Sequence, residues 1–140
     1  MGINLSRFIT AQKGDYAKAL EEIKSGRKRG HWMWYIFPQI KGLGYSFYST
    51  YYAIKDIEEA RAYIDDDLLG GRLREISREL LMLQESDAEK IFGTPDDLKL
   101  RSCMTLFSQV DNSDDNVFKK VIDKFFEGNL DELTIRNLLS

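Results

Sequence analysis

Residues 69–83, LGGRLREISRELLML, are the stretch of the chain that decides its fold. Apolar side chains recur here at intervals of three or four residues, at Leu69, Leu73, Ile76, Leu80 and Leu83. This period is typical of an amphipathic helix with one buried face, and charged side chains occupy the opposite face. Gly70 and Gly71 each lower helix stability by about 1 kcal/mol relative to alanine, so we expect a close packing contact at this pair.

The same helical period recurs on both sides of this stretch. Upstream, it predicts a helix of about three turns from Tyr16 to Gly26 and another that begins at Asp56. Downstream, cap-like residues predict further helix starts at Ser86, Pro95, Ser113 and Asp131. The sequence therefore predicts an all-α fold, a single compact domain over residues 1–140 with about six to eight helices. One contiguous core is expected to include Leu73, Ile76, Leu80, Phe107, Val121 and Phe125.

Length and composition are those of one ordinary globular domain. The chain has 140 residues, of which 43% are hydrophobic and 31% charged, and a formal net charge of −3. We expect no nucleic-acid partner, because there is no long-range positive field, and no membrane span, because no apolar run is long enough. A single cysteine, Cys103, predicts a reducing, cytoplasmic setting and a buried structural thiol. Because the chain has one cysteine and one histidine, we expect no metal site, and no cofactor is predicted.

Residues 31–39, HWMWYIFPQ, are the exception to the helical pattern. They hold both tryptophans, the only histidine and one of the two prolines. Pro38 keeps Phe37 out of the helical conformation, so the chain must become extended or turn there. A glycine loop follows at residues 42–44, and Ser46 or Ser49 is expected to cap a helix that contains Tyr51, Tyr52 and Ile54. Any strand is expected only around residues 37–48.

This irregular segment is also the predicted ligand site. An aromatic wall beside a glycine loop and a helix N-terminus would suit a small aromatic or phosphorylated, nucleotide-like ligand. The candidate ligand-binding residues are His31, Trp32, Trp34, Gln39, Lys41, Gly42, Gly44, Lys99 and Arg101. Among them, His31 is the candidate general acid–base, since its unperturbed pKa is near neutrality. Core packing of the two tryptophans and a structural role for His31 are the alternative interpretation.

The chain resembles a known bacterial family, the domain of unknown function numbered 1810. The residues that carry the likeness are HWMW-x-x-FPQ at residues 31–39 joined to GLG at 42–44, with LGGRL at 69–73 and MTLF at 104–107. The resemblance implies a small, mainly helical single domain and brings no established activity. Where the family usually has His-Pro before the Leu-Gly pair, this chain has three aspartates at residues 65–67, so any role of that histidine is absent here.

Members of this family sometimes carry a calpastatin-like label. Inhibitors of the calpastatin type are extended, disordered segments that fold on a protease, whereas this chain has a full set of amphipathic helices and aromatic side chains to bury. The sequence therefore favours an independently folded domain.

Two further functions are open at the level of sequence, and the chain's status as an enzyme is open with them. The C-terminal part, with Lys99, Met104 and Phe107, is faintly similar to the NADAR family of ADP-ribose-associated proteins. That likeness implies N-glycosidic bond hydrolysis with a carboxylate, for which Glu21, Glu22 or Asp97 are the candidates. Alternatively, a protein-interaction module would expose a flat patch made of Trp32, Tyr35 and Phe37. The sequence determines neither the ligand nor the oligomeric state.

Overall fold

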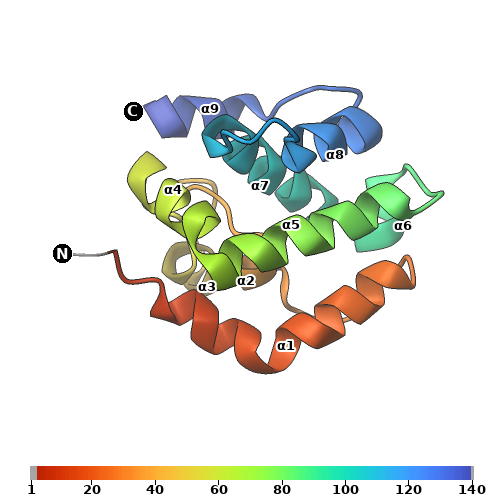
Figure 1. Cartoon of the computed structure of the whole chain (residues 1–140), viewed down its shortest axis with the longest axis horizontal. Helices are drawn as coiled ribbons and strands as arrows, with labels where there is room; N and C mark the ends of the chain where they lie inside the picture. Colours follow the sequence, from red (N-terminus) through yellow and green to blue (C-terminus); the bar gives the residue numbers. More distant parts are fainter. Residues whose placement is uncertain (1–2, 140) are drawn as a thin grey trace.

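The computed structural model describes residues 3–139, which form nine helices and no strand (Figure 1). In chain order the helices are α1 (Ser6–Lys24), α2 (Met33–Ile36), α3 (Phe47–Tyr51), α4 (Ile57–Asp65), α5 (Asp67–Met82), α6 (Ala88–Phe92), α7 (Asp96–Val110), α8 (Val117–Phe126) and α9 (Glu132–Leu139). The all-α prediction is confirmed. The number of helices is higher than predicted because the segment expected to be irregular contains α2, a single turn of four residues.

Helix α5 is the centre of the packing, with α1 along one side and α8 along the other (Figure 1). The predicted stripe explains this position, since Leu69, Leu73, Ile76 and Leu80 are all buried. All six residues predicted for the core belong to one buried apolar cluster, which α7 and α8 complete with Phe107, Val121 and Phe125. The chain is thus a folded domain with its own core, as its helical stripes predict.

The two glycines of α5 differ in their surroundings. A methyl group at Gly70 would lie 2.0 Å from the carbonyl oxygen of Ile64, at the end of α4. A methyl group at Gly71 would meet no atom within 4 Å. The expected close contact therefore exists at Gly70 alone, where the absence of a side chain lets α4 turn directly into α5.

Several helices begin where the sequence predicts. The Asp56 carboxylate accepts a hydrogen bond from the backbone N–H of Glu59 (2.9 Å), and Asp131 accepts one from the N–H of Thr134 (3.1 Å). Both side chains cap otherwise unpaired amides of a first helical turn. Gly26 follows the end of α1 with φ of +85°, the left-handed conformation that favours glycine.

Other helix boundaries differ from the prediction. Helix α1 begins at Ser6, well before Tyr16, because Phe8 and Gln12 extend its buried face by two turns. Asp87 rather than Ser86 caps α6, and Pro95 is the cap residue of α7 instead of its first helical residue.

Helix α8 also starts later than predicted. Asn116 is its N-cap and accepts from the N–H of Lys119 (3.1 Å), whereas Ser113 donates its hydroxyl to Asp111 (2.9 Å) in the preceding loop. Several residues in this loop have side chains that can cap a helix, so the packing of α8 against α5 and α7 decides which one does.

The backbone after α2 is extended, as Pro38 predicts. Ile40 forms an isolated parallel β-bridge with Ile54, in which the N–H of Ile54 donates to the carbonyl of Gln39 (2.7 Å) and the N–H of Lys41 to the carbonyl of Ile54 (2.9 Å). Ile40 lies in the region where strand structure was expected, but Ile54 does not. Helix α3 ends at Tyr51, so the prediction that Ile54 belongs to it is wrong.

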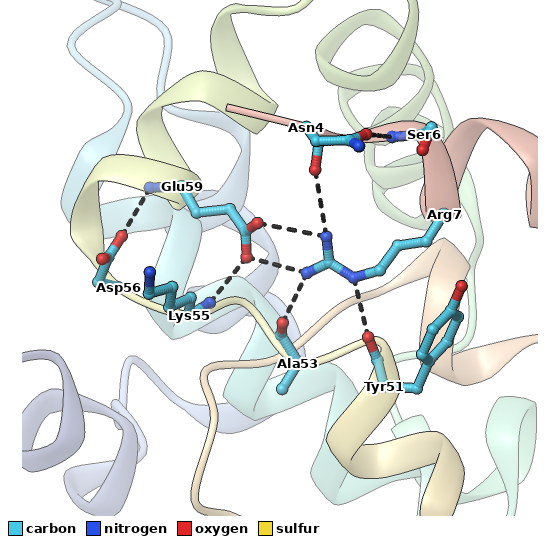
Figure 2. Close-up of polar contacts among 8 residues, drawn as sticks. All are labelled: Asn4, Ser6, Arg7, Tyr51, Ala53, Lys55, Asp56 and Glu59. Carbon is cyan, nitrogen blue, oxygen red and sulfur yellow. Dashed lines mark hydrogen bonds and ion pairs between the residues drawn. The ribbon is translucent and has the colours of Figure 1, made fainter. Parts of the chain in front are cut away.

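Arg7 of α1 fixes the chain between α3 and α4 (Figure 2). Its guanidinium donates to the carbonyls of Tyr51 and Ala53, both at 2.8 Å, and pairs with both carboxylate oxygens of Glu59 at 2.9 and 3.2 Å. Glu59 in turn accepts from the backbone N–H of Lys55 (2.8 Å). A bidentate pair of this kind sets both orientation and distance, so the segment that carries Ala53 is held in one position.

Residues 3–139 contain neither a membrane-spanning helix nor a cluster of metal ligands. None of the helices there is both long and apolar enough to cross a membrane. Nor do three or more histidine, cysteine, aspartate or glutamate side chains gather in this part of the chain in a way that would hold a metal ion.

Candidate functional site

A pocket of about 430 Å³ lies beside the β-bridge, between the irregular segment and helices α7 and α9. Its lining is mainly apolar and aromatic, with a few polar groups: Trp34, Gln39, Ile40, Leu43, Gly44, Ser49, Tyr52, Ala53, Pro95, Leu98, Lys99, Ser102, Asp131 and Leu133. This size and composition are those of small-molecule sites, which measure roughly 300–1,000 Å³ and have a few polar groups in an apolar wall.

Gln39 is the unusual residue of this wall. Its side-chain nitrogen, Nε2, is buried and has no hydrogen-bond partner among the residues that the structure describes. Leaving such a donor unpaired costs about 1–3 kcal/mol, and native proteins rarely do so. The pocket wall therefore contains a residue whose buried N–H donor is satisfied by nothing in residues 3–139.

Unlike the amide nitrogen of Gln39, the charged group of Lys99 in this wall already has partners, Trp34 and Asp96. The Lys99 ammonium lies 4.0 Å from the centroid of the Trp34 ring and 2.9 Å from a carboxylate oxygen of Asp96. The other oxygen of Asp96 pairs with Lys28 at 2.8 Å, and Lys28 lies over the Trp32 ring at 5.1 Å. Burial raises the pKa of Asp96, but the two lysines lower it more, so the pKa is below its ordinary value. Asp96 thus holds both lysines over the tryptophan rings.

Trp32 belongs to the core, with 2% of its surface exposed. Its indole N–H donates to Glu22 (3.0 Å), which also accepts from the backbone N–H groups of Arg29 (2.6 Å) and Gly30 (2.8 Å). Burial raises the pKa of the Glu22 carboxyl, but these hydrogen bonds outweigh it and leave the pKa below its ordinary value. Glu22 therefore fixes the loop between α1 and α2 and takes no part in the pocket.

The nine predicted ligand residues fall into three groups. Four of them line the pocket: Trp34, Gln39, Gly44 and Lys99. Two more, Lys41 and Gly42, line a neighbouring hollow of about 240 Å³, which Gly44 also lines. Three lie elsewhere: His31, Trp32 and Arg101. The His31 side chain is exposed, and Arg101 donates to the carbonyls of Asn129 and Leu130, both at 2.8 Å, so it fixes the turn between α8 and α9.

The start of α3 has the Ser46 cap that the sequence predicts. The helix has only five residues, and the Ser46 hydroxyl accepts from the backbone N–H of Ser49 at 3.1 Å. The prediction of an exposed patch made of Trp32, Tyr35 and Phe37 is wrong, because Trp32 and Phe37 are buried. Exposed aromatic side chains are found instead in and before α3, at Tyr45, Phe47, Tyr48 and Tyr51.

Sequence reasoning missed most of the wall that α7 and α9 contribute. Pro95, Leu98, Lys99 and Ser102 share one face of α7 at helical spacing, and 55% of the Leu98 surface is exposed although its helix is otherwise well buried. That spacing is visible in the sequence. The sequence does not show which residues lie opposite this face of α7. Asp131 reaches it through tertiary packing, where its carboxylate accepts from the Ser102 hydroxyl at 3.1 Å.

Comparison with known proteins agrees with this architecture. The sequence model of a family described as "Protein of unknown function (DUF1810)" matches residues 2–138. The chain belongs to this family. The crystal structure of the conserved hypothetical protein Rv1873 from Mycobacterium tuberculosis is similar to this DUF1810 domain, with 44% sequence identity and a TM-score of 0.93 over 97% of this chain and 96% of that one. No curated protein matches the sequence.

These comparisons confirm the resemblance carried by the aromatic and glycine motifs. They give no support to the faint likeness to the NADAR family. For this DUF1810 domain, function therefore has to be argued from the pocket itself.

Proposed function

We propose that this domain binds a small, flat, largely apolar molecule in the pocket, through an acceptor atom that pairs with Nε2 of Gln39. The single observation behind the proposal is that this buried donor is unpaired. A ligand acceptor would recover the free energy that the lone N–H costs, so the pocket favours a ligand with an acceptor over a purely apolar one.

The composition of the wall supports a flat ligand. Trp34 and Tyr52 supply aromatic surface, and Leu43, Pro95 and Leu98 supply apolar contact. Aromatic side chains stack on planar groups with a gain of about 0.5–1.5 kcal/mol beyond area burial. Lys99 adds a positive charge that Asp96 already neutralises in part, so it favours an electron-rich ring without requiring an anion.

A cytoplasmic setting is part of the same proposal. Cys103 is a free, buried thiol, and burial raises its pKa well above the ordinary value. Such a thiol is unreactive and suits a structural role in a reducing compartment.

The binding test uses NMR with adenosine, free adenine, nicotinamide and indole as probes. At least one of the flat probes with an acceptor should shift the Gln39 side-chain amide resonance and the Trp34 indole N–H, while indole, which has only a donor, should bind more weakly. The Trp32 indole N–H is an internal control, because Glu22 holds it outside the pocket. Shifts confined to surface resonances, or no saturable shift with any probe, would refute the proposal.

A substitution separates binding from stability. Gln39→Leu replaces the unpaired donor with an apolar side chain of similar size. The variant should therefore unfold at a higher urea concentration, with a gain of about 1 kcal/mol in the free energy of unfolding, and should no longer bind the probe. Gln84→Leu, at an exposed position outside the pocket, is the matched control and should bind like wild type. If Gln39→Leu is destabilised and still binds, Gln39 is a structural residue.

The geometry favours binding over N-glycosidic hydrolysis. None of Glu21, Glu22 and Asp97 lines the pocket, and the carboxylate that does, Asp131, is engaged by Ser102 and Thr134. Glycosidic cleavage uses two carboxylates on either side of the bond. The protein-interaction alternative would now rest on the exposed aromatic side chains in and just before α3, where Tyr45 is 98% and Phe47 72% exposed.

A further inference from the structure

The hollow next to the pocket is flanked by two lysines, Lys41 and Lys55. The β-bridge explains why they are together. In a parallel bridge that pairs Ile40 with Ile54, the next residues of both segments, Lys41 and Lys55, are neighbours, and so are the preceding ones, Gln39 and Ala53. Sequence reasoning singled out Lys41 but not Lys55, which is 14 residues away in the chain.

The alternation of an extended chain places these residues on one face. Ile40 and Ile54 are buried in the core, so their neighbours on either side face the opposite way. Gln39 and Ala53 line the pocket, and Lys41, Ala53 and Lys55 line the hollow. Gly44, Ser49 and Ala53 line both the pocket and the hollow, so the two adjoin.

Two like charges on directly neighbouring chains destabilise a bridge. Among the residues described, neither Lys41 nor Lys55 has a carboxylate within ion-pair distance. Ser49, Thr50 and the backbone of Gly42 add polar surface to the same hollow. A doubly charged anion between the lysines would remove their repulsion, and phosphate monoesters carry that charge near neutral pH.

We propose that Lys41 and Lys55 form a phosphate subsite, so that the ligand is an aromatic phosphate monoester of nucleotide-like length. Its ring occupies the pocket against Gln39, and its phosphate occupies the hollow. This inference rests on the proposed function for the ring and adds an independent site for the anion.

The test compares adenosine, adenosine 5′-monophosphate and inorganic phosphate in calorimetric and NMR titrations. Wild type should bind the monophosphate about tenfold more tightly than adenosine at low salt, and the preference should shrink as salt is added. Lys41→Gln/Lys55→Gln should abolish the preference and leave adenosine affinity unchanged. Lys13→Gln/Lys18→Gln changes the net charge equally at exposed positions of α1 and should keep the preference.

The possible failures are distinguishable. If adenosine binds but the monophosphate is no tighter, or if both double variants lose the preference alike, the subsite is refuted while the pocket stands. If no aromatic probe binds but inorganic phosphate shifts the amides of Lys41 and Lys55, the subsite stands and the ring pocket is refuted. If phosphate moves these amides equally in Lys41→Gln/Lys55→Gln, the lysines do not bind the anion and the subsite is refuted.

Discussion

Substituting the two adjacent glycines of α5, one at a time, gives a sharp test of the packing. Gly70→Ala and Gly71→Ala add the same methyl group to neighbouring positions of one helix. At Gly70 the methyl carbon would lie 2.0 Å from the carbonyl oxygen of Ile64, whereas at Gly71 it would have no neighbour within 4 Å. The two variants should therefore change stability in opposite directions.

The expected magnitudes follow from these distances. Both substitutions gain about 1 kcal/mol in helix propensity. Gly70→Ala must also push α5 away from the end of α4 by more than 1 Å, as ordinary contacts need about 3.4 Å. The short link between these helices leaves little room, and overpacking of this kind costs about 3 kcal/mol. The net effects are about 2 kcal/mol of destabilisation at Gly70 and about 1 kcal/mol of stabilisation at Gly71.

Thermal and urea unfolding followed by circular dichroism at 222 nm would measure both effects. At about 4 °C per kcal/mol, the midpoint should fall by about 8 °C for Gly70→Ala and rise by about 4 °C for Gly71→Ala. Equal shifts in the two variants would show that α4 and α5 do not meet at Gly70, and the explanation of this glycine pair would be wrong.

Three further predictions concern the core, an ion pair and pH. Phe125→Ala should lower the free energy of unfolding by about 3–5 kcal/mol in urea titrations, because it empties one end of the core, and an unchanged midpoint would contradict the assignment. Arg7→Met should cost about 3 kcal/mol by leaving the carboxylate of Glu59 unpaired, and Arg7→Met/Glu59→Leu should recover part of that loss; if the double variant is the less stable, the pair is not coupled as described. The pKa of Glu22 is lowered from 4.5, so its ionised form stabilises the fold. The free energy of unfolding should therefore be higher for wild type than for Glu22→Gln at pH 7, and this difference should shrink as the pH falls below 4.5. A difference that does not change with pH would exclude this linkage.

The helices could be predicted from sequence because their signal is local. The apolar stripe of α5 and the carboxylates of Asp56 and Asp131 act within one or two turns of the chain. Boundaries were less predictable where several residues can cap, as before α8, where Asn116 is used and Ser113 is not. Tertiary packing selects among such local choices.

The site was predictable only in part, because α2 is a single turn. Residues two apart on so short a helix point in different directions, and the sequence does not say which direction α7 will occupy. The structure turns Trp34 towards α7 and the pocket and buries Trp32 against Phe37 and Lys28. Lys55 could not be predicted from the sequence for a related reason, because its position beside Lys41 depends on a β-bridge that has no local turn signal.

Gln39 is the point where stability and binding conflict. Pro38 ends the helical pattern just before it, and the extended backbone that follows forms the bridge with Ile54 through the Gln39 carbonyl. That bond fixes the backbone but leaves the side-chain amide in the pocket wall without a partner. The Gln39→Leu variant would be more stable than wild type, whereas in wild type a ligand acceptor would recover the free energy that the unpaired donor costs. Binding should therefore raise the stability of wild type and leave that of Gln39→Leu unchanged, so that wild type matches the variant when ligand is present at about four times its Kd and is the more stable protein above that concentration.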